Sequence, residues 1–221
     1  MKEQFKNQII IDGLQYCNWN REIFEDLWRG GLTAVHATLV YWENTEESFN
    51  KIDEWNDLFI QHKDIICQAH NTRDIIEAKK NNKVAIIFGF QNSAPIANDI
   101  FLLEKFFSRG LRFMQLTYNN QTPLAGGCFE ANDSGVSRFG HAVIEEMNRL
   151  GMIVDLSHAG RQTCLDAISL SSKPVAISHA NPQFFHKSIR NIDDEVLKNL
   201  AKKDGFIGLS LYPFHLKNHG D

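Results

Sequence analysis

Short apolar segments alternate with longer amphipathic segments along most of the chain. The apolar segments are rich in β-branched and aromatic residues, which is typical of buried β-strands. In the segments between them, apolar residues recur every three or four positions, which predicts helices. We predict main strands at residues 8–14, 33–41, 84–90, 111–117, 152–158, 174–179 and 206–212, and a minor strand at residues 65–67.

Strands that alternate with helices fit either a doubly wound sheet or a (β/α)₈ barrel. Polar residues gather at the carboxyl ends of several predicted strands, and in a barrel this face carries the active site. The chain contains no G-x-G-x-x-G motif and no P-loop, which counts against a nucleotide-binding sheet. We therefore predict one domain over residues 1–221, a (β/α)₈ TIM barrel with about seven of its eight strands in this chain. Either the eighth strand is missing, or another segment covers the open edges.

The composition is that of an ordinary globular domain, with 43% hydrophobic and 23% charged residues among 221. The net charge of −4 gives no reason to expect nucleic acid or an anionic membrane as a partner. The N-terminal residues are polar and no long apolar run follows, so we expect neither a signal peptide nor a transmembrane segment. The four cysteines are scattered without a CxxC pair, which favours reduced thiols and a cytoplasmic location.

Two predicted strands end in the same dipeptide, Ser-His. Residues 152–158 end at His158, residues 174–179 end at His179, and residues 161–169 between them are predicted as a helix. A strand, a crossover helix and a parallel strand bring both histidines to the same edge of the sheet. Two neighbouring imidazoles can bind a metal ion, although zinc takes three or four ligands. A single such histidine is more often structural, so both interpretations stay open.

Further polar residues follow the predicted strands at 84–90 and 111–117. Gln91, Tyr118 and Asn119 come directly after these strands and are expected to face the same barrel mouth. Gln91 could be a weak, neutral metal ligand, but a hydrogen-bonding amide is the favoured interpretation. Tyr118 and Asn119 are candidate substrate-binding residues.

Three charged residues are also candidates. Asp12 ends the first predicted strand and could be a metal ligand, a hydrogen-bond acceptor behind a ligand, or a helix cap. Asp155 lies three residues before His158 and faces the other way in a regular strand, so we interpret it as structural or as an acceptor behind the ligands. Arg190 could hold a substrate carboxylate or be a solvated loop residue.

His36 is interpreted as a core histidine. The histidines interpreted as exposed are His141, His186, His215 and His219.

Several segments resemble the membrane (renal) dipeptidase family, the M19 metallopeptidases. The resemblance runs from about Ile11 to Tyr212 and rests on residues 83–89, 111–119, 146–151, 155–158, 177–179 and 190–197. It implies a barrel of the metal-dependent hydrolase (amidohydrolase) type, with two zinc ions that activate a water for attack on a dipeptide bond. His158 and His179 match the two histidines of one zinc, and Arg190 matches an arginine that contacts the substrate carboxylate. The family is commonly dimeric, which implies a homodimer.

Other positions depart from the family pattern. The first strand of the family reads Asp-Gly-His-x-Asp and supplies ligands of the second zinc, whereas Leu14 and Tyr16 stand at those two ligand positions. We expect these two side chains to fill the vacated space. The metal-bridging glutamate corresponds to Gln91, and a substrate-contacting histidine corresponds to Tyr118. The aspartate that serves the catalytic water is expected beyond Asp221, so no catalytic acid–base residue is assigned in this chain.

The missing carboxylates limit the metal content that we expect. Two adjacent dications without bridging carboxylates repel strongly, so at most one Zn²⁺ per chain is expected on His158 and His179, with Gln91 as a weak third ligand. The predicted function is a dipeptidase-like metallohydrolase that acts on dipeptides or another small amide. The alternative is a non-catalytic descendant of the family that binds a small ligand or a protein partner in the barrel mouth. Metal content separates the two hypotheses.

Overall fold

The computed structural model describes residues 7–217, and its strands form one sheet. The strands are β1 (Ile11–Gln15), β2 (Ala34–Val40), β3 (Ile66–Gln68), β4 (Val84–Phe90), β5 (Leu111–Gln115), β6 (Ile153–Asp155), β7 (Ala176–Ala180) and β8 (Phe206–Leu209). The helices are α1 (Arg21–Gly30), α2 (Thr45–Gln61), α3 (Thr72–Lys80), the 3₁₀ helix η2 (Ala94–Ile96), α4 (Phe101–Ser108), α5 (Arg138–Leu150), α6 (Arg161–Leu170), α7 (Asp194–Lys202) and α8 (Pro213–Leu216). The polar residues that begin at Met1 and the tail that contains His219 and Asp221 lie outside the described residues.

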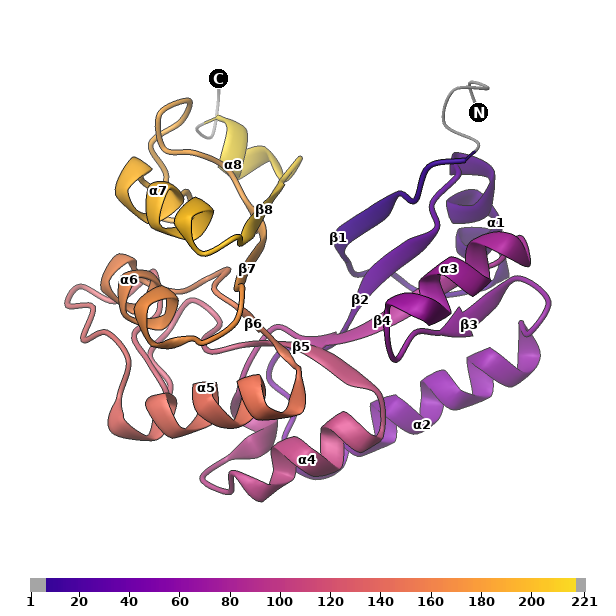
Figure 1. The fold of residues 1–221 in the computed structure, drawn as a ribbon, viewed down its shortest axis with the longest axis horizontal. Coiled ribbons are helices and arrows are strands. Elements are labelled where there is room, and N and C mark those ends of the chain that lie inside the picture. The colour runs from indigo at the N-terminus through magenta and orange to yellow at the C-terminus, as the bar shows by residue number, and fades with distance from the viewer. Residues whose placement is uncertain (1–6, 218–221) are drawn as a thin grey trace.

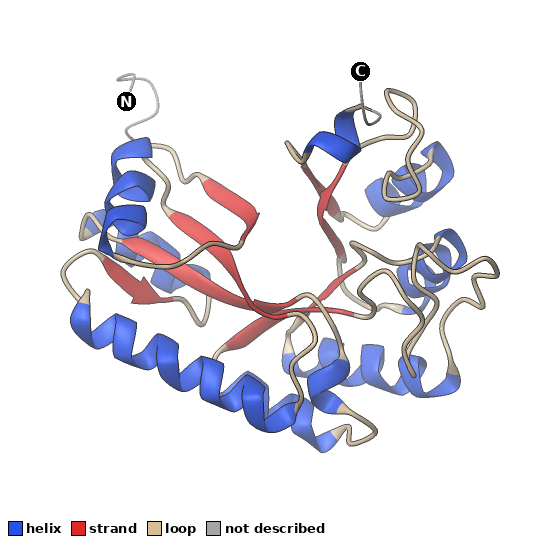
Figure 2. Ribbon diagram, turned by 180° about the vertical axis from the view of Figure 1, so that it is seen from behind, coloured by secondary structure: helices blue, strands red, loops and turns tan. Residues whose placement is uncertain are grey.

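The strands are parallel and follow the order β1-β2-β4-β5-β6-β7-β8, while β3 pairs with the first residues of β4. Figure 1 shows these strands along an arc, with the helices packed on its outer side. Figure 2 shows the same arrangement from behind, with the strands in red and the helices in blue. The sheet is a nearly closed parallel barrel, which confirms the predicted (β/α)₈ fold with seven barrel strands among the described residues.

Side-chain caps fix where the helices begin, and therefore where the loops at the barrel mouth end. In α2, the side chain of Asn44 accepts from the backbone N–H of Glu47, and Glu47 accepts from the N–H of Asn44. Asp193 caps α7, because its side chain accepts from the N–H of Val196. The left-handed Gly151, at φ 81°, ends α5. Among the described residues, no helix combines the length and apolar character needed to span a membrane.

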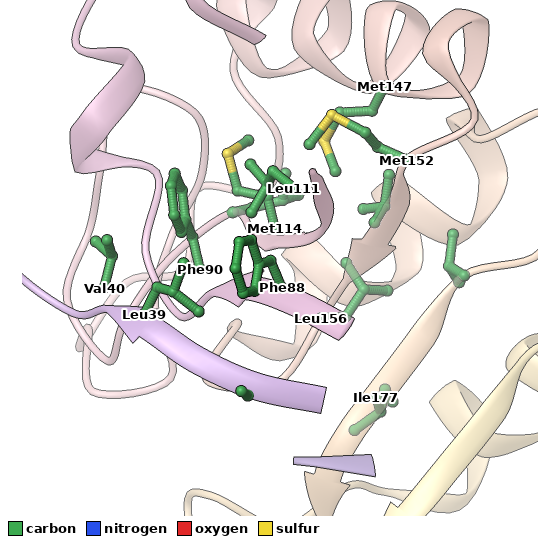
Figure 3. Close-up of a cluster of buried hydrophobic side chains, with 14 of the residues drawn as sticks. Leu39, Val40, Phe88, Phe90, Leu111, Met114, Met147, Met152, Leu156 and Ile177 are labelled. Atoms are coloured by element: carbon green, nitrogen blue, oxygen red, sulfur yellow. The ribbon is translucent and has the colours of Figure 1, made fainter. Parts of the chain in front are cut away.

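The main hydrophobic core lies between the sheet and the helices. Every residue of β2 and of β4 is buried. Figure 3 shows Phe88 and Phe90 of β4 beside Met114 of β5, within the same buried cluster. Full burial of an aliphatic or aromatic side chain contributes about 1.5–3 kcal/mol to folding, so this core holds the strand ends of the mouth in place.

His36 fills the interior of the barrel near β4. It is 2% exposed, which confirms its interpretation as a core histidine. Its Nδ1 atom donates to the carbonyl oxygen of Gly13, at 2.8 Å, and its ring stacks on Phe113 with centroids 4.3 Å apart. The ring lies against Gly89, where an added Cβ atom would come within 1.7 Å of the imidazole. Position 89 of β4 must therefore be glycine for the His36 ring of β2 to fit.

Candidate functional site

The two Ser-His segments meet at the carboxyl ends of β6 and β7. His179 belongs to β7, and His158 lies in the loop that follows β6. Their Nε2 atoms are 2.8 Å apart, and the ring centroids are 4.8 Å apart. The structure therefore brings together the two histidines that the sequence had singled out.

Each of these imidazoles has a hydrogen-bond acceptor at its Nδ1 atom. The Nδ1 atom of His158 lies 2.6 Å from Oδ1 of Asn119, an amide oxygen that only accepts. The Nδ1 atom of His179 lies 3.0 Å from Oγ of Ser178, and this hydroxyl already donates its proton to Asp155. Both Nδ1 atoms therefore carry a proton, and both Nε2 atoms face each other with lone pairs.

Asp155 is fully buried behind the histidine pair. Its Oδ1 atom accepts from the backbone N–H groups of Ser157 and Ser178, and its Oδ2 atom accepts from Ser178 Oγ and from Nε2 of Gln115. Burial acts to raise the pKa of Asp155, but the hydrogen bonds from the Ser178 hydroxyl and from the Ser157 N–H contribute to a net lowering of this pKa. The ionised carboxylate fixes the direction of the Ser178 proton, and Ser178 in turn orients His179.

Both histidines of the pair are held neutral. Burial lowers the pKa of His158 well below its ordinary value, and the positive charge of Arg190 lowers it further. Burial also lowers the pKa of His179 to about 3, with Arg190 again the next cause. Two lone pairs 2.8 Å apart repel each other unless a cation lies between them, and the low pKa values disfavour a proton in that position. Neutral imidazoles with free Nε2 atoms are the form that binds a metal ion, so the pair fits one.

The described residues do not complete the coordination of a metal ion. Within residues 7–217, no group of three or more His, Cys, Asp or Glu side chains is placed to hold one. Gln91 lines the same cavity, but its Nε2 atom donates to Oγ1 of Thr38 at 2.9 Å, as the hydrogen-bonding interpretation expects. The pair therefore provides two nitrogen ligands, fewer than the three or four that zinc takes.

Arg190 lies in the loop between β7 and α7 and is 7% exposed. Its Nη2 atom donates to the carbonyl oxygen of His179 at 3.1 Å. No carboxylate of residues 7–217 lies within ion-pair distance of this guanidinium. Burial lowers the pKa of Arg190, because the charged form loses hydration. A buried cation without a partner carboxylate favours an anionic ligand at this place.

The remaining predicted site residues lie around the same mouth. Tyr118 follows β5, and its ring stacks on His158 with centroids 4.3 Å apart. The Oδ1 atom of Asp12 accepts from the backbone N–H of Leu14, and its Oδ2 atom accepts from Nε2 of Gln15. Asp12 is not a helix cap, because Asn20 caps the helix that follows β1.

A cavity of about 1220 Å³ contains the histidine pair and borders both ends of the sheet. The predicted site residues that line it are Asp12, Gln91, Tyr118, Asn119, His158, His179 and Arg190. Leu14 and Tyr16 also line this cavity, and Tyr16 is 62% exposed. The prediction that Tyr16 fills the vacated space is wrong, because its ring is largely exposed after the end of β1. Leu14 is half-buried at the wall of the same cavity, so for this residue the filling of the space stays a prediction.

His215 was predicted to be exposed, and this prediction is wrong. The residue is 5% exposed, in the short helix α8 that follows β8, and it lines the cavity of the histidine pair. Burial lowers its pKa to about 4, and the charge of Arg190 contributes to the shift. Its position depends on where α8 packs against the loop after β7, where the side chains of Asn181 and Asn191 donate to the His215 carbonyl oxygen. No local sequence pattern indicates that contact.

The family of the chain follows from its sequence as a whole. The family described as membrane dipeptidase (peptidase family M19) matches residues 19–220. This chain belongs to the M19 family. The chain is similar to Dipeptidase 3 of Mus musculus, with 30% identity over 96% of this chain and 44% of the mouse protein. It is also similar to an uncharacterized dipeptidase of Schizosaccharomyces pombe, with 32% identity over 71% of this chain and 40% of that protein. The chain thus spans less than half the length of these curated relatives.

Solved structures share the barrel. An amidohydrolase from Pseudomonas aeruginosa superposes with a TM-score of 0.91 at 40% identity, over 94% of this chain and 63% of the other. A metallo peptidase from Rhodobacter sphaeroides, liganded with a phosphinate mimic of the dipeptide L-Ala-D-Ala, superposes with a TM-score of 0.80 at 16% identity, over 91% of this chain and 73% of the other. At 16% identity, the similarity to the metallo peptidase supports only the shared fold.

Proposed function

We propose that this M19 member is a metal-dependent hydrolase of dipeptides or similar small amides, with at most one metal ion per chain, bound by His158 and His179. The observation that carries the proposal is the pair of Nε2 atoms 2.8 Å apart, with a hydrogen-bond partner at the Nδ1 atom of each ring. A metal ion bound at such a pair supplies a Lewis acid and an activated water for amide hydrolysis.

The protein groups around the pair have distinct tasks in this proposal. Asn119 and Ser178 accept the Nδ1 protons, which directs both Nε2 lone pairs into the cavity. Asp155 holds Ser178 in the accepting orientation. Partial loss of hydration at the cavity wall lowers the pKa of both imidazoles and keeps them neutral at neutral pH.

Arg190 would bind the carboxylate of the substrate. Its guanidinium is buried at the cavity wall beside His179 and has no carboxylate partner within residues 7–217. A carboxylate ligand would restore charge balance and would be held by two N–H groups of the planar guanidinium. The free carboxylate of a dipeptide has this chemistry. A homodimer and a cytoplasmic location stay predictions.

The second candidate function is binding without catalysis. It is favoured by the ligand count, because residues 7–217 offer the pair no third His, Cys, Asp or Glu ligand. It is also favoured by Asp155, the buried carboxylate behind the pair, which is fully engaged in hydrogen bonds and does not line the cavity.

Metal analysis and a peptidase assay on the same preparations test the proposal. The protein is expected to retain up to one zinc per chain after dialysis, and the double variant His158→Ala, His179→Ala is expected to retain none. His141→Ala, at an exposed position on α5, is the matched control and is expected to keep the metal. Hydrolysis of unblocked dipeptides that is lost in the double variant would support the enzyme. Metal-free protein that hydrolyses no dipeptide would favour the binding function, and two tightly bound zinc ions would contradict the single-metal site.

A further inference from the structure

Four aromatic side chains form the walls of a second cavity at the barrel mouth. Tyr16 follows β1, Tyr41 and Trp42 follow β2, and Tyr118 follows β5. Neighbouring rings stand nearly perpendicular to one another. Tyr16 and Tyr41 meet at 90°, Tyr41 and Tyr118 at 77°, and Trp42 and Tyr118 at 87°, with centroids 5.9, 5.6 and 5.2 Å apart. The rings therefore meet edge to face rather than in a stack, and we call these four residues the aromatic cage.

Two carboxylates complete the lining of this cavity of about 560 Å³, those of Glu43 and Glu47. The Oε2 atom of Glu43 accepts from the backbone N–H groups of Tyr41 and Trp42, and Oε2 of Glu47 accepts from the N–H of Asn44. These bonds fix both side chains at the start of α2. Within residues 7–217, neither carboxylate has a Lys, Arg or His side chain within ion-pair distance. The cavity thus combines negative charge with the negative faces of aromatic rings.

We propose that the aromatic cage binds an organic ammonium group. A cation is attracted both by ring faces, through the ring quadrupole, and by the two carboxylates. An anion is repelled by both features. A neutral apolar group could contact the rings but would gain nothing from Glu43 and Glu47. A bare metal ion requires several oxygen ligands, whereas the lining offers two carboxylates and mostly carbon.

The cage adjoins the histidine pair through a shared side chain. Tyr118 forms one wall of the cage, and the same ring stacks on His158. Tyr16 and Tyr41 also line both the cage and the cavity of the histidine pair, so the two cavities adjoin. The ligand would then be the substrate itself, an amino compound whose amide lies at the histidine pair. This identification of the ligand rests on the proposed hydrolase function. The binding of a cation by the cage does not depend on it.

The test compares choline with 3,3-dimethylbutan-1-ol, a neutral molecule of the same shape in which carbon replaces nitrogen. Isothermal titration calorimetry of the full chain at constant ionic strength is expected to show at least about fivefold tighter binding of choline. Trp42→Leu and Tyr16→Leu are expected to weaken choline binding about fivefold or more. Tyr16→Phe keeps the ring and is expected to retain binding. Trp28→Leu, at an exposed position on α1, is the control away from the cage.

A second variant protects the test against loss of folding. Glu47→Gln keeps the capping function, because glutamine serves at this helix position, and removes one negative charge. It is expected to weaken choline binding without changing the binding of the alcohol. Equal binding of the two molecules, no binding of choline, or unchanged binding in Trp42→Leu would overturn the cage. A dipeptidase assay distinguishes the two proposals, since choline binding in a protein without dipeptidase activity would leave the cage standing and reject the hydrolase.

Discussion

The side chains of Asn119 and His158 meet across 39 residues of sequence, with Oδ1 of Asn119 2.6 Å from Nδ1 of His158. Both residues adopt left-handed backbone conformations, with φ values of 65° and 66°. This region is uncommon for residues other than glycine, although asparagine and histidine enter it more often than most. Strained backbone of this kind persists where the surrounding structure holds it. Here the Thr117 hydroxyl and the Cys128 N–H both donate to the carbonyl oxygen of His158.

The bond between these two residues predicts a specific effect on metal binding. Asn119→Gly accommodates the left-handed backbone but removes the acceptor, so the proton of His158 is no longer fixed on Nδ1. Loss of such a partner behind a metal ligand typically weakens metal binding about 10–100-fold. Asn119→Asp keeps an acceptor oxygen and is expected to bind metal at least as well as asparagine does. Zinc affinities measured by competition with a chromophoric chelator check both outcomes.

The same backbone change made elsewhere is the control for this experiment. Asn82 is exposed, has a φ of 54° and lies between α3 and β4. Asn82→Gly is expected to leave zinc affinity unchanged. If Asn119→Gly and Asn82→Gly behave alike, the hydrogen bond to His158 has no role in metal binding.

The buried histidines predict that the metal-free protein loses stability as the pH falls. Burial and Arg190 lower the pKa values of His158 and His179, the latter to about 3. Between about pH 6.5 and pH 4 the unfolded chain therefore binds more protons than the folded chain, and the free energy of unfolding decreases with decreasing pH. The imidazole of His179, with its pKa of about 3, contributes about 2 kcal/mol to this loss at pH 5, and His158 contributes with the same sign.

Urea unfolding at pH 7 and pH 5, in the presence of a chelator, measures this difference. His179→Gln has no titrating group at that position and is expected to lose less stability between the two pH values. His141→Gln, at an exposed site, serves as the matched control and is expected to behave like the unsubstituted protein. A free energy of unfolding that is the same at both pH values would contradict the prediction.

The histidine pair could be predicted from the sequence because its cause is local. Two strands that end in Ser-His and flank a helix place His158 and His179 at one edge of a parallel sheet, whatever the rest of the chain does. The partners of the pair could not be predicted in the same way. Asn119 reaches His158 through a long loop, and His215 becomes buried where α8 packs on another loop. Such contacts depend on the paths of loops, for which the hydrophobic pattern carries no signal.

The position of Tyr16 shows a second limit of sequence reasoning. A large aromatic residue at a family ligand position suggested a filled pocket, yet the ring is 62% exposed and borders two cavities. A side chain fills a space only if other residues enclose it. Along β1 the enclosing residues depend on the whole sheet, because this strand pairs with β2 and ends the strand order of the described residues.

The contact between His36 and Gly89 predicts a large effect of a single methyl group. A Cβ atom at position 89 would lie 1.7 Å from Nε2 of His36, and the ring has no room to move because it stacks on Phe113 and is bonded to Gly13. Gly89→Ala is therefore expected to destabilise the protein by about 3 kcal/mol or more, the upper range for an overpacked core. Urea unfolding measures the change. Gly30→Ala is the control, because nothing lies within 4 Å of a Cβ atom there, and it is expected to be neutral or slightly stabilising.

A double-mutant cycle separates this clash from a general intolerance of β4. His36→Ala removes the ring and leaves a cavity, so it is expected to destabilise the barrel on its own. With the ring gone, the added methyl group at position 89 meets empty space, and Gly89→Ala in the His36→Ala background should cost at least about 2 kcal/mol less than in the unsubstituted protein. Additive effects of the two substitutions would mean that Gly89 is required for the backbone of β4 and not for the packing of His36.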